Sequence, residues 1–187
     1  MRLITPLFAC LLLWATATAV SAASLQPPPI EPKKGETYYT RHNLWHQNGV
    51  SFGTNYAAGD LVPINSRVKV LAIGRKELIF RVEEGDRVIL RNIPKYTKRT
   101  VKEIAANLLS PTPIAYDALG EQLARDIRFG ILSRGMTKEQ VIMARGYPPQ
   151  HKTPSLEFDR WVYWSSRMVQ RALLFENGTL SQGRGVR

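Results

Sequence analysis

The stretch GMTKEQVIMARGYPP, residues 135–149, decides the fold of this chain because it predicts a short helix with both ends marked. Thr137 is placed as the N-cap. Gln140, three residues later, completes a capping box in which each side chain satisfies a backbone N–H at the helix start. Gly146 predicts the left-handed residue that ends many helices, and the two prolines that follow prevent continuation. The stretch therefore predicts a capped helix followed by a loop.

Aromatic strands are predicted after this helix, at 161–164 and 173–175, meeting at Asn177-Gly178. Asn-Gly between apolar runs is typical of a type I′ hairpin turn. Because successive strand residues face opposite sides, at most one or two of the aromatic residues in 161–164 share a surface that could stack on a ligand. The whole unit is expected to be a helix, a loop and a β-meander, and it contains no catalytic motif.

The first 22 residues have the pattern of a secretory signal peptide. Arg2 is the charged start, residues 7–20 are largely apolar, and Val20-Ser21-Ala22 offers small residues for cleavage. The apolar run is shorter than the ~20 residues that a bilayer span needs. We therefore expect export to the periplasm of a Gram-negative bacterium, at most peripheral to the outer membrane, with no transmembrane segment in the mature chain.

Cys10 is the only cysteine in the sequence. The segment from Leu7 to Cys10 faintly resembles a bacterial lipobox, but the apolar run continues past Cys10, and Phe8 is bulky where a small residue is usual. A lipoprotein is therefore not predicted. The mature chain has no cysteine, which excludes a disulfide, a thiol nucleophile and a thiolate metal site.

Basic residues exceed acidic ones. Without residues 1–22 the chain keeps 25 basic and 15 acidic residues, a net charge of +10. In an exported protein such a charge suits an anionic envelope component such as phospholipid, lipopolysaccharide or a wall polymer, and no nucleic-acid partner is expected. The basic residues are scattered, so part of the excess is equally explained by a solvated surface.

The mature chain is long enough for two small cores. Residues 23–36 form a proline-rich linker, and residues 37–98 are expected to form a β-domain, because 67–74, 77–82 and 87–92 alternate apolar and polar residues between tight turns. Earlier strands are predicted at 38–41 and 50–52. Short antiparallel strands favour closure into a small barrel or sandwich.

Two helical segments follow the β-domain. Thr100 and Glu103 form a second capping box, which starts a helix in a connector over residues 99–116. A further amphipathic helix is predicted from Asp117 to about Phe129, and both helices are expected to cover a sheet. It opens an α+β domain over 117–182, followed by a polar tail at 183–187.

One tetrad matches an enzyme motif. Ser66-Arg67-Val68-Lys69 has the S-x-x-K spacing of penicillin-binding enzymes, whose chemistry needs the serine at a helix start with the lysine one turn later. Here the tetrad enters a β-alternating segment, where residues three apart point to opposite faces. We therefore predict no enzyme, no catalytic residue and no cofactor, and keep a wall-acting enzyme only as the third alternative.

The spacing of two histidines gives a weak indication of a zinc site. His42 and His46 have the i, i+4 spacing of a helical zinc site, but their segment lies beside β-type sequence and His151 is far away in the chain. Surface or loop histidines are the expected interpretation, and no metal site is predicted.

The surface to test first for a partner is the loop YPPQHKTPS, residues 147–155. Its prolines make it stiff, and a stiff loop loses little entropy on binding. A purely structural crossover between helix and meander is the favoured interpretation, and a binding role is the alternative. The candidate interaction residues are Tyr147, His151, Lys152, Arg160 and Arg167.

Two family resemblances follow from these motifs. Residues 59–63, GDLVP, followed by 68–71, loosely resemble a bacterial SH3-like domain. The order of Gly135-Met136-Thr137, Val141, Gly146-x-Pro148, Trp161-x-Tyr163 and Leu174-Phe175-x-Asn177-Gly178-x-Leu180 resembles the SmpA/OmlA/BamE family, which shares the fold of the β-lactamase-inhibitory protein. This second match spans about residues 124–181.

The BamE-like resemblance implies a small non-enzymatic envelope protein linked to outer-membrane protein assembly or envelope integrity. The expected architecture is α+β, with an N-terminal SH3-like β-barrel followed by a BamE-like helix-plus-antiparallel-meander domain. The leading hypothesis is a binding or scaffold module for an envelope protein or an anionic envelope component. An inhibitor of a periplasmic enzyme and a wall-binding module are the alternatives.

Overall fold

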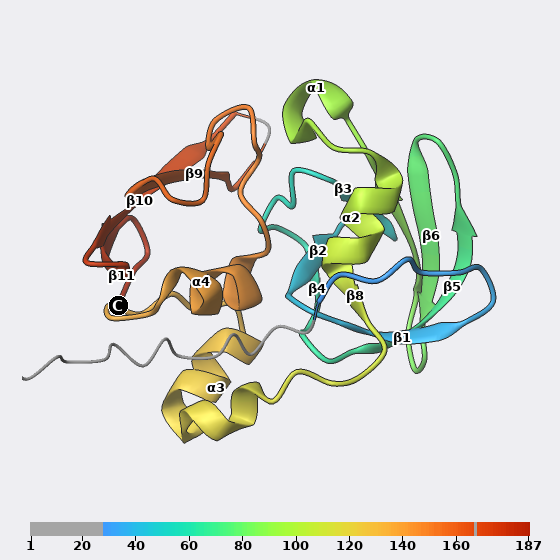
Figure 1. The fold of residues 1–187 in the computed structure, drawn as a ribbon, viewed down its shortest axis with the longest axis horizontal. Coiled ribbons are helices and arrows are strands. Elements are labelled where there is room, and N and C mark those ends of the chain that lie inside the picture. The colour runs from blue at the N-terminus through green and yellow to red at the C-terminus, as the bar shows by residue number, and fades with distance from the viewer. Residues whose placement is uncertain (1–27, 167) are drawn as a thin grey trace, which may run out of the picture.

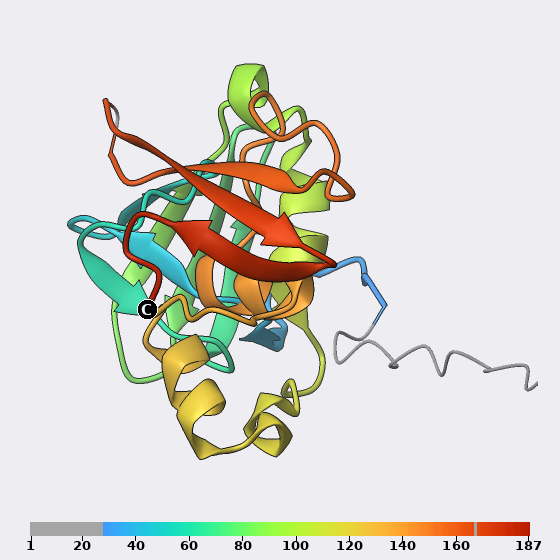
Figure 2. The same ribbon diagram turned by 90° about the vertical axis from the view of Figure 1, so that its left-hand side faces the viewer.

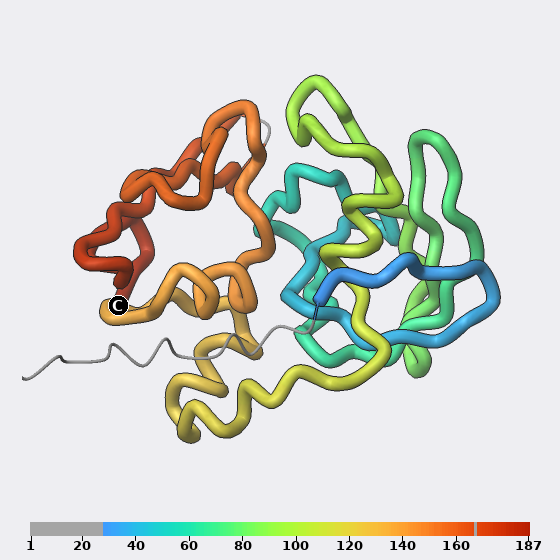
Figure 3. Tube along the Cα trace, in the orientation of Figure 1, coloured from blue at the N-terminus to red at the C-terminus, as the bar shows by residue number. Residues whose placement is uncertain are grey.

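The computed structural model describes residues 28–166 and 168–187, and the protein has an α+β fold. The predicted signal peptide and the start of the predicted linker lie outside the described residues. Two parts stand beside each other in Figure 1, a β-rich part and a part built from two helices and a three-stranded sheet. Figure 3 shows the chain passing between them through the segment after β8 (Leu109–Ser110). No described helix has the length and apolarity needed to cross a membrane.

The β-rich part is built on a six-stranded sheet with the order β3-β7-β6-β5-β1-β8. All neighbouring pairs are antiparallel except β3 with β7. Within the described residues, its edge strands β3 and β8 do not pair with each other, so the ladder of backbone pairings does not close. A separate ribbon pairs β2 with β4. The remaining strands are β1 (Thr37–Thr40), β2 (Leu44–His46), β3 (Val50–Phe52), β4 (Asp60–Val62), β5 (Arg67–Ile73), β6 (Glu77–Val82) and β7 (Arg87–Arg91).

The alternation of apolar and polar residues along the strands predicts this sheet, because only one face of the sheet is buried. Val68 and Val70 of β5, and Leu78 and Phe80 of β6, are fully buried, whereas Lys69 between the two valines is exposed. Helix α2 (Val101–Leu108) covers the buried face, and the Thr100–Glu103 capping box at its start is present as predicted. Four residues at Pro94–Thr97 form the short helix α1, which the sequence analysis did not predict.

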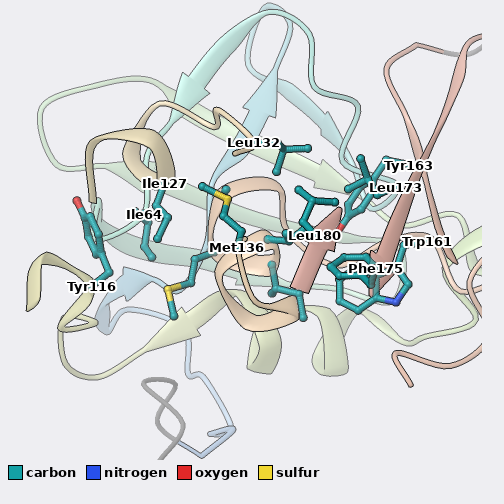
Figure 4. Packing of buried hydrophobic residues seen from close by; sticks show 14 of the residues in the cluster. Ile64, Tyr116, Ile127, Leu132, Met136, Trp161, Tyr163, Leu173, Phe175 and Leu180 are labelled. Carbon is teal, nitrogen blue, oxygen red and sulfur yellow. The ribbon is translucent and has the colours of Figure 1, made fainter. Parts of the chain in front are cut away.

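The second part packs helices α3 (Glu121–Arg128) and α4 (Lys138–Arg145) with a meander of β9 (Arg160–Trp164), β10 (Gln170–Glu176) and β11 (Thr179–Gly183). Figure 2 shows the meander lying over α4. Trp161, Leu173 and Phe175 from the sheet point into one core with Met136 and Ile127 from the helical side (Figure 4). The Thr137–Gln140 capping box is formed as predicted.

Three predictions about this part need correction. The helix expected from Asp117 to Phe129 is interrupted: a 3-10 turn, η1 (Tyr116–Leu119), ends at Gly120, whose φ of +93° breaks the helical path before α3. Asn177-Gly178 does form a turn with positive φ at both residues, but it joins β10 to β11 rather than to β9. A third strand was missed because residues 179–183 are mostly polar.

The end of the chain is held against the second part, although a polar tail was expected at 183–187. The Arg187 N–H donates to the Leu132 carbonyl at 2.9 Å, and the Arg134 N–H donates to the Arg187 carbonyl at 2.9 Å. Val186 packs on the core. The sequence did not predict this because Val186 is the only apolar residue in 183–187, and the two backbone hydrogen bonds leave no trace in residue type.

Candidate functional site

The two parts meet through buried polar side chains. Asn43, fully buried between β1 and β2, donates through Nδ2 to the carbonyls of Ile127 (2.6 Å) and Ala144 (3.0 Å). Its Oδ1 accepts from the Ile64 N–H at 2.7 Å. One side chain thus binds the C-terminal ends of α3 and α4 to the β-rich part. The amide is fully used, as buried amides generally are.

Gly146 lies at the same interface and was predicted to adopt the left-handed helical conformation. Its φ of 73° is positive, but its ψ of −177° is extended, so the prediction was right about glycine and wrong about the conformation. A Cβ at this position would lie 2.4 Å from Asn55 Nδ2 and 3.0 Å from His42 Nδ1. Asn55 Nδ2 in turn donates to the carbonyls of Asn43 (3.1 Å) and Arg145 (2.8 Å). The glycine is needed because the side chains of Asn55 and His42 lie too close to it to admit a Cβ.

His42 and His46 are buried, which corrects the expectation of surface histidines. His42 Nδ1 lies 2.9 Å from the Asn43 carbonyl, and its ring meets Tyr147 edge-on at 5.8 Å between centroids. His46 lies on β2, so the two side chains do not share a helical face. No group of three or more metal-ligand side chains occurs among the described residues.

Burial lowers the pKa of His42 from 6.5 to about 4, because charging the ring would strip it of water inside the interface, and Arg41 and Arg99 add repulsion. Between pH 6.5 and 4 the unfolded chain binds a proton that the folded chain does not. The contribution of neutral His42 to stability is therefore fully present above pH 6.5. The free energy of unfolding is expected to fall by up to about 3 kcal/mol as the pH drops towards 4. Urea unfolding across this range should show a steeper loss in the wild type than in His42→Gln. Parallel pH profiles for the two proteins would contradict this assignment.

A small cavity lies beside His42, between the two parts. Tyr147, Pro148 and Pro149 line it from the second part, and Arg99 lies over the Tyr147 ring at 5.0 Å. Its volume is about 40 Å³. Sites for drug-sized ligands typically measure a few hundred Å³ or more, so this cavity is too small for a ligand of that size.

A larger hollow opens where three segments converge, and we call it the aromatic groove. Its volume is about 410 Å³, in the range of ligand pockets. Figures 1 and 2 show α1 beside the loop of residues 147–155 at this end of the molecule. The groove is lined from β3 and the loop after it, from α1 and its preceding residue, and from the β9–β10 hairpin, by Phe52, Thr54, Tyr56, Ile93, Tyr96, Trp164 and Met168.

His151 joins two walls of the aromatic groove. Its ring lies 4.9 Å from that of Tyr96 and stacks on Trp164 at 6.0 Å with an interplanar angle of 19°. The backbone N–H of His151 donates to the Tyr96 carbonyl at 3.1 Å, and Nδ1 lies 3.1 Å from the same oxygen. Since a carbonyl only accepts, Nδ1 carries the proton in this contact. The row Tyr96–His151–Trp164 is thus fixed before any ligand binds.

Two polar atoms at the groove lack a hydrogen bond. Thr54 Oγ1 and Trp164 Nε1 are buried and have no partner among the described residues. Buried polar atoms are normally paired, so these two are exceptions among the described residues. Met168 at the rim is 89% exposed, the largest exposure among the described large hydrophobic residues that lie at the surface. Exposed methionine and aromatic side chains together are typical of interaction surfaces.

Charge around the groove is positive. Lys95 Nζ lies 5.5 Å from the Tyr96 ring centre. Lys152 and Lys98 are close enough to lower the pKa of His151, although burial is the larger cause. None of the described lining residues is acidic. The groove therefore combines aromatic walls with a basic rim.

The candidate residues from the sequence fall in different places. His151 and Lys152 lie at the aromatic groove, whereas Tyr147 faces the small cavity. Arg160 is exposed at the opposite end of β9 from Trp164, so it does not share this surface. Arg167 lies outside the described residues.

The remaining sequence motif does not form a catalytic arrangement. Ser66 precedes β5 and Lys69 lies exposed on that strand, so the serine is not at a helix start. Sequence reasoning missed Phe52, Tyr56 and Tyr96 as groove residues, because their only signal was aromatic character and they lie in segments far from the 147–155 loop in the sequence. No protein-family model, no curated protein and no solved structure matches this chain. The functional proposal therefore depends on the geometry of the aromatic groove.

Proposed function

We propose that this protein is a non-enzymatic exported binding module of the cell envelope, and that the aromatic groove is its contact surface. The observation that supports this most is the preformed row Tyr96–His151–Trp164 with an exposed Met168 beside it. Tyrosine, tryptophan and methionine are enriched where proteins bind partners. A preformed surface also loses less conformational entropy on binding.

The partner that fits best is an acidic, extended protein segment carrying an apolar or aromatic side chain. The aromatic walls offer stacking area for that side chain, and the basic rim of Lys95, Lys98 and Lys152 complements negative charge. The net charge of +11 for the whole chain favours the same class of partner at long range. An envelope protein of this character is the proposed ligand.

The finer architecture belongs to the same proposal. The six-stranded sheet with α2 is proposed to be an SH3-like module, and α4 with the β9–β11 meander a BamE-like module. The capped helix before a three-stranded meander supports the second assignment. Export depends on residues 1–22, and periplasmic location is proposed from their composition alone.

A capture experiment with groove variants tests the function. Full-length protein carrying Met168→Glu or Trp164→Ala should recover at least about tenfold less envelope protein after mild cross-linking than the wild type, because Trp164→Ala removes a stacking wall and Met168→Glu opposes an acidic partner. The matched control is Phe129→Glu, since Phe129 is 58% exposed and lies outside the groove lining. Quantitative mass spectrometry compares the eluates. Equal recovery by all four proteins would overturn the proposed contact surface.

A further inference from the structure

Three arginines from separate elements line another small cavity, which also borders on β9 and on the segment after β11. Arg145 is the last residue of α4, Arg171 lies on β10, and Arg184 follows β11. The cavity volume is about 30 Å³. Its lining residues differ entirely from those of the aromatic groove. The two sites are therefore separate.

None of the three guanidinium groups has an acidic partner in the described part of the chain. Ion pairs there involve Arg67, Arg91, Lys102 and Lys138 instead. Arg171 Nε is buried and makes no hydrogen bond to a described residue. Buried or clustered arginines in proteins are normally paired with an anionic group. Three of them around one cavity without a carboxylate therefore lack the anion that would balance their charge.

The local packing holds these groups in place. The Arg145 guanidinium lies 5.1 Å from the Trp45 ring, a cation–π contact that leaves its edge N–H groups unused. Arg171 lies opposite Tyr163 in the β9–β10 register, and the Tyr163 hydroxyl donates to the Gly146 carbonyl at 2.9 Å. A Cβ on Gly185 would lie 3.1 Å from Arg171 Nη1. Burial, with added repulsion from Arg171, lowers the pKa of Arg145, as expected where like charges share a site.

We propose that the cavity formed by Arg145, Arg171 and Arg184 binds a phosphoryl group. Guanidinium groups bind phosphate oxygens through paired N–H contacts, and a dianionic phosphate neutralises most of the positive charge gathered here. The cavity has room for one compact group, which excludes a sugar ring or an aromatic ligand. Inorganic phosphate and the phosphomonoester of a lipid headgroup share this chemistry. The proposal does not depend on the aromatic groove.

Binding of inorganic phosphate to the full-length protein, measured by calorimetry at constant ionic strength with chloride as the reference, tests the site. The wild type should bind phosphate in preference to chloride. Arg184→Gln should weaken binding about tenfold, because it removes one charged donor. Arg184 is exposed, so this variant should fold, and thermal unfolding checks that it does. Arg171→Gln should weaken binding at least as much.

The matched control is Arg125→Gln, which removes the same charge from an exposed position on α3 outside this cavity. It should bind phosphate as the wild type does. Flotation with vesicles containing phosphatidic acid, phosphatidylglycerol or phosphatidylcholine distinguishes the source: capture by phosphatidic acid alone supports a lipid phosphomonoester, and capture by none, with phosphate binding intact, supports the free ion. Absence of phosphate binding in the wild type, or equal weakening by Arg125→Gln, would overturn the site.

Discussion

Replacing Asn43 by alanine is expected to lower the free energy of unfolding by about 3–5 kcal/mol, the largest effect of any single polar substitution in the interface. The change removes the hydrogen-bond partner of the Ile64 N–H and of the Ala144 carbonyl in a fully buried place, and leaves the Ile127 carbonyl with the Gly130 N–H as its donor. An unpaired buried polar group costs about 1–3 kcal/mol, and water cannot reach these three without opening the interface. Urea unfolding measures the loss.

Two further variants separate hydrogen bonding from packing. Asn43→Asp keeps the shape but cannot donate to the Ile127 and Ala144 carbonyls, so it should be about as destabilising as alanine above pH 6. Gln182→Ala removes an exposed amide from β11 and should change stability by no more than about 0.5 kcal/mol. A loss below about 1 kcal/mol in both Asn43 variants would show that the contacts between the two parts are not what stabilises them.

Gly146→Ala is expected to cost about 4 kcal/mol or more. Its combination of positive φ and extended ψ is essentially restricted to glycine, and strain of this kind costs about 1–3 kcal/mol by itself. The new Cβ would also lie 2.4 Å from Asn55 Nδ2, which is held by two hydrogen bonds and cannot move without breaking them. Chemical denaturation of the purified variant gives the value.

Gly135→Ala is the matched control for Gly146→Ala. Gly135 also has positive φ, at 83°, but an added Cβ meets no atom within 4 Å. Its cost should be limited to backbone strain, about 1–2 kcal/mol. Equal losses in the two variants would mean that the close approach of Asn55 and His42 to Gly146 does not contribute.

Local signals in the sequence predicted much of the regular structure. Both capping boxes, Thr100–Glu103 and Thr137–Gln140, depend on residues three apart, and the strands at 77–82 and 50–52 follow from alternation or short apolar runs between turns. The break at Gly120 was missed because Leu119 and Leu123 keep their helical spacing across it. A single glycine inside such a pattern does not by itself show which conformation it takes.

Local sequence signals could not predict the interface or the aromatic groove, because both depend on residues far apart in the chain. Asn43 contacts residues 84 and 101 positions later in the chain, and Asn55 contacts one 90 positions later. The burial of His42 follows from the same long-range packing. The groove needs the segments around Tyr56, Tyr96 and Trp164 to converge. The loop at 147–155 was singled out for its stiffness and residue types, but only the fold shows that the His151 ring lies between those of Tyr96 and Trp164.

Site-specific photocrosslinking in the native host is the sharpest test of the proposed contact between the aromatic groove and an acidic envelope protein. Benzoylphenylalanine placed at Met168, on the groove rim, should form adducts with a defined envelope protein after irradiation. The same probe at Phe129, an exposed apolar position outside the groove lining, should not form them. Adducts from position 168 that disappear in a Trp164→Ala background are the predicted result. No adduct at position 168, or the same adducts at both positions, would show that the aromatic groove is not the contact surface.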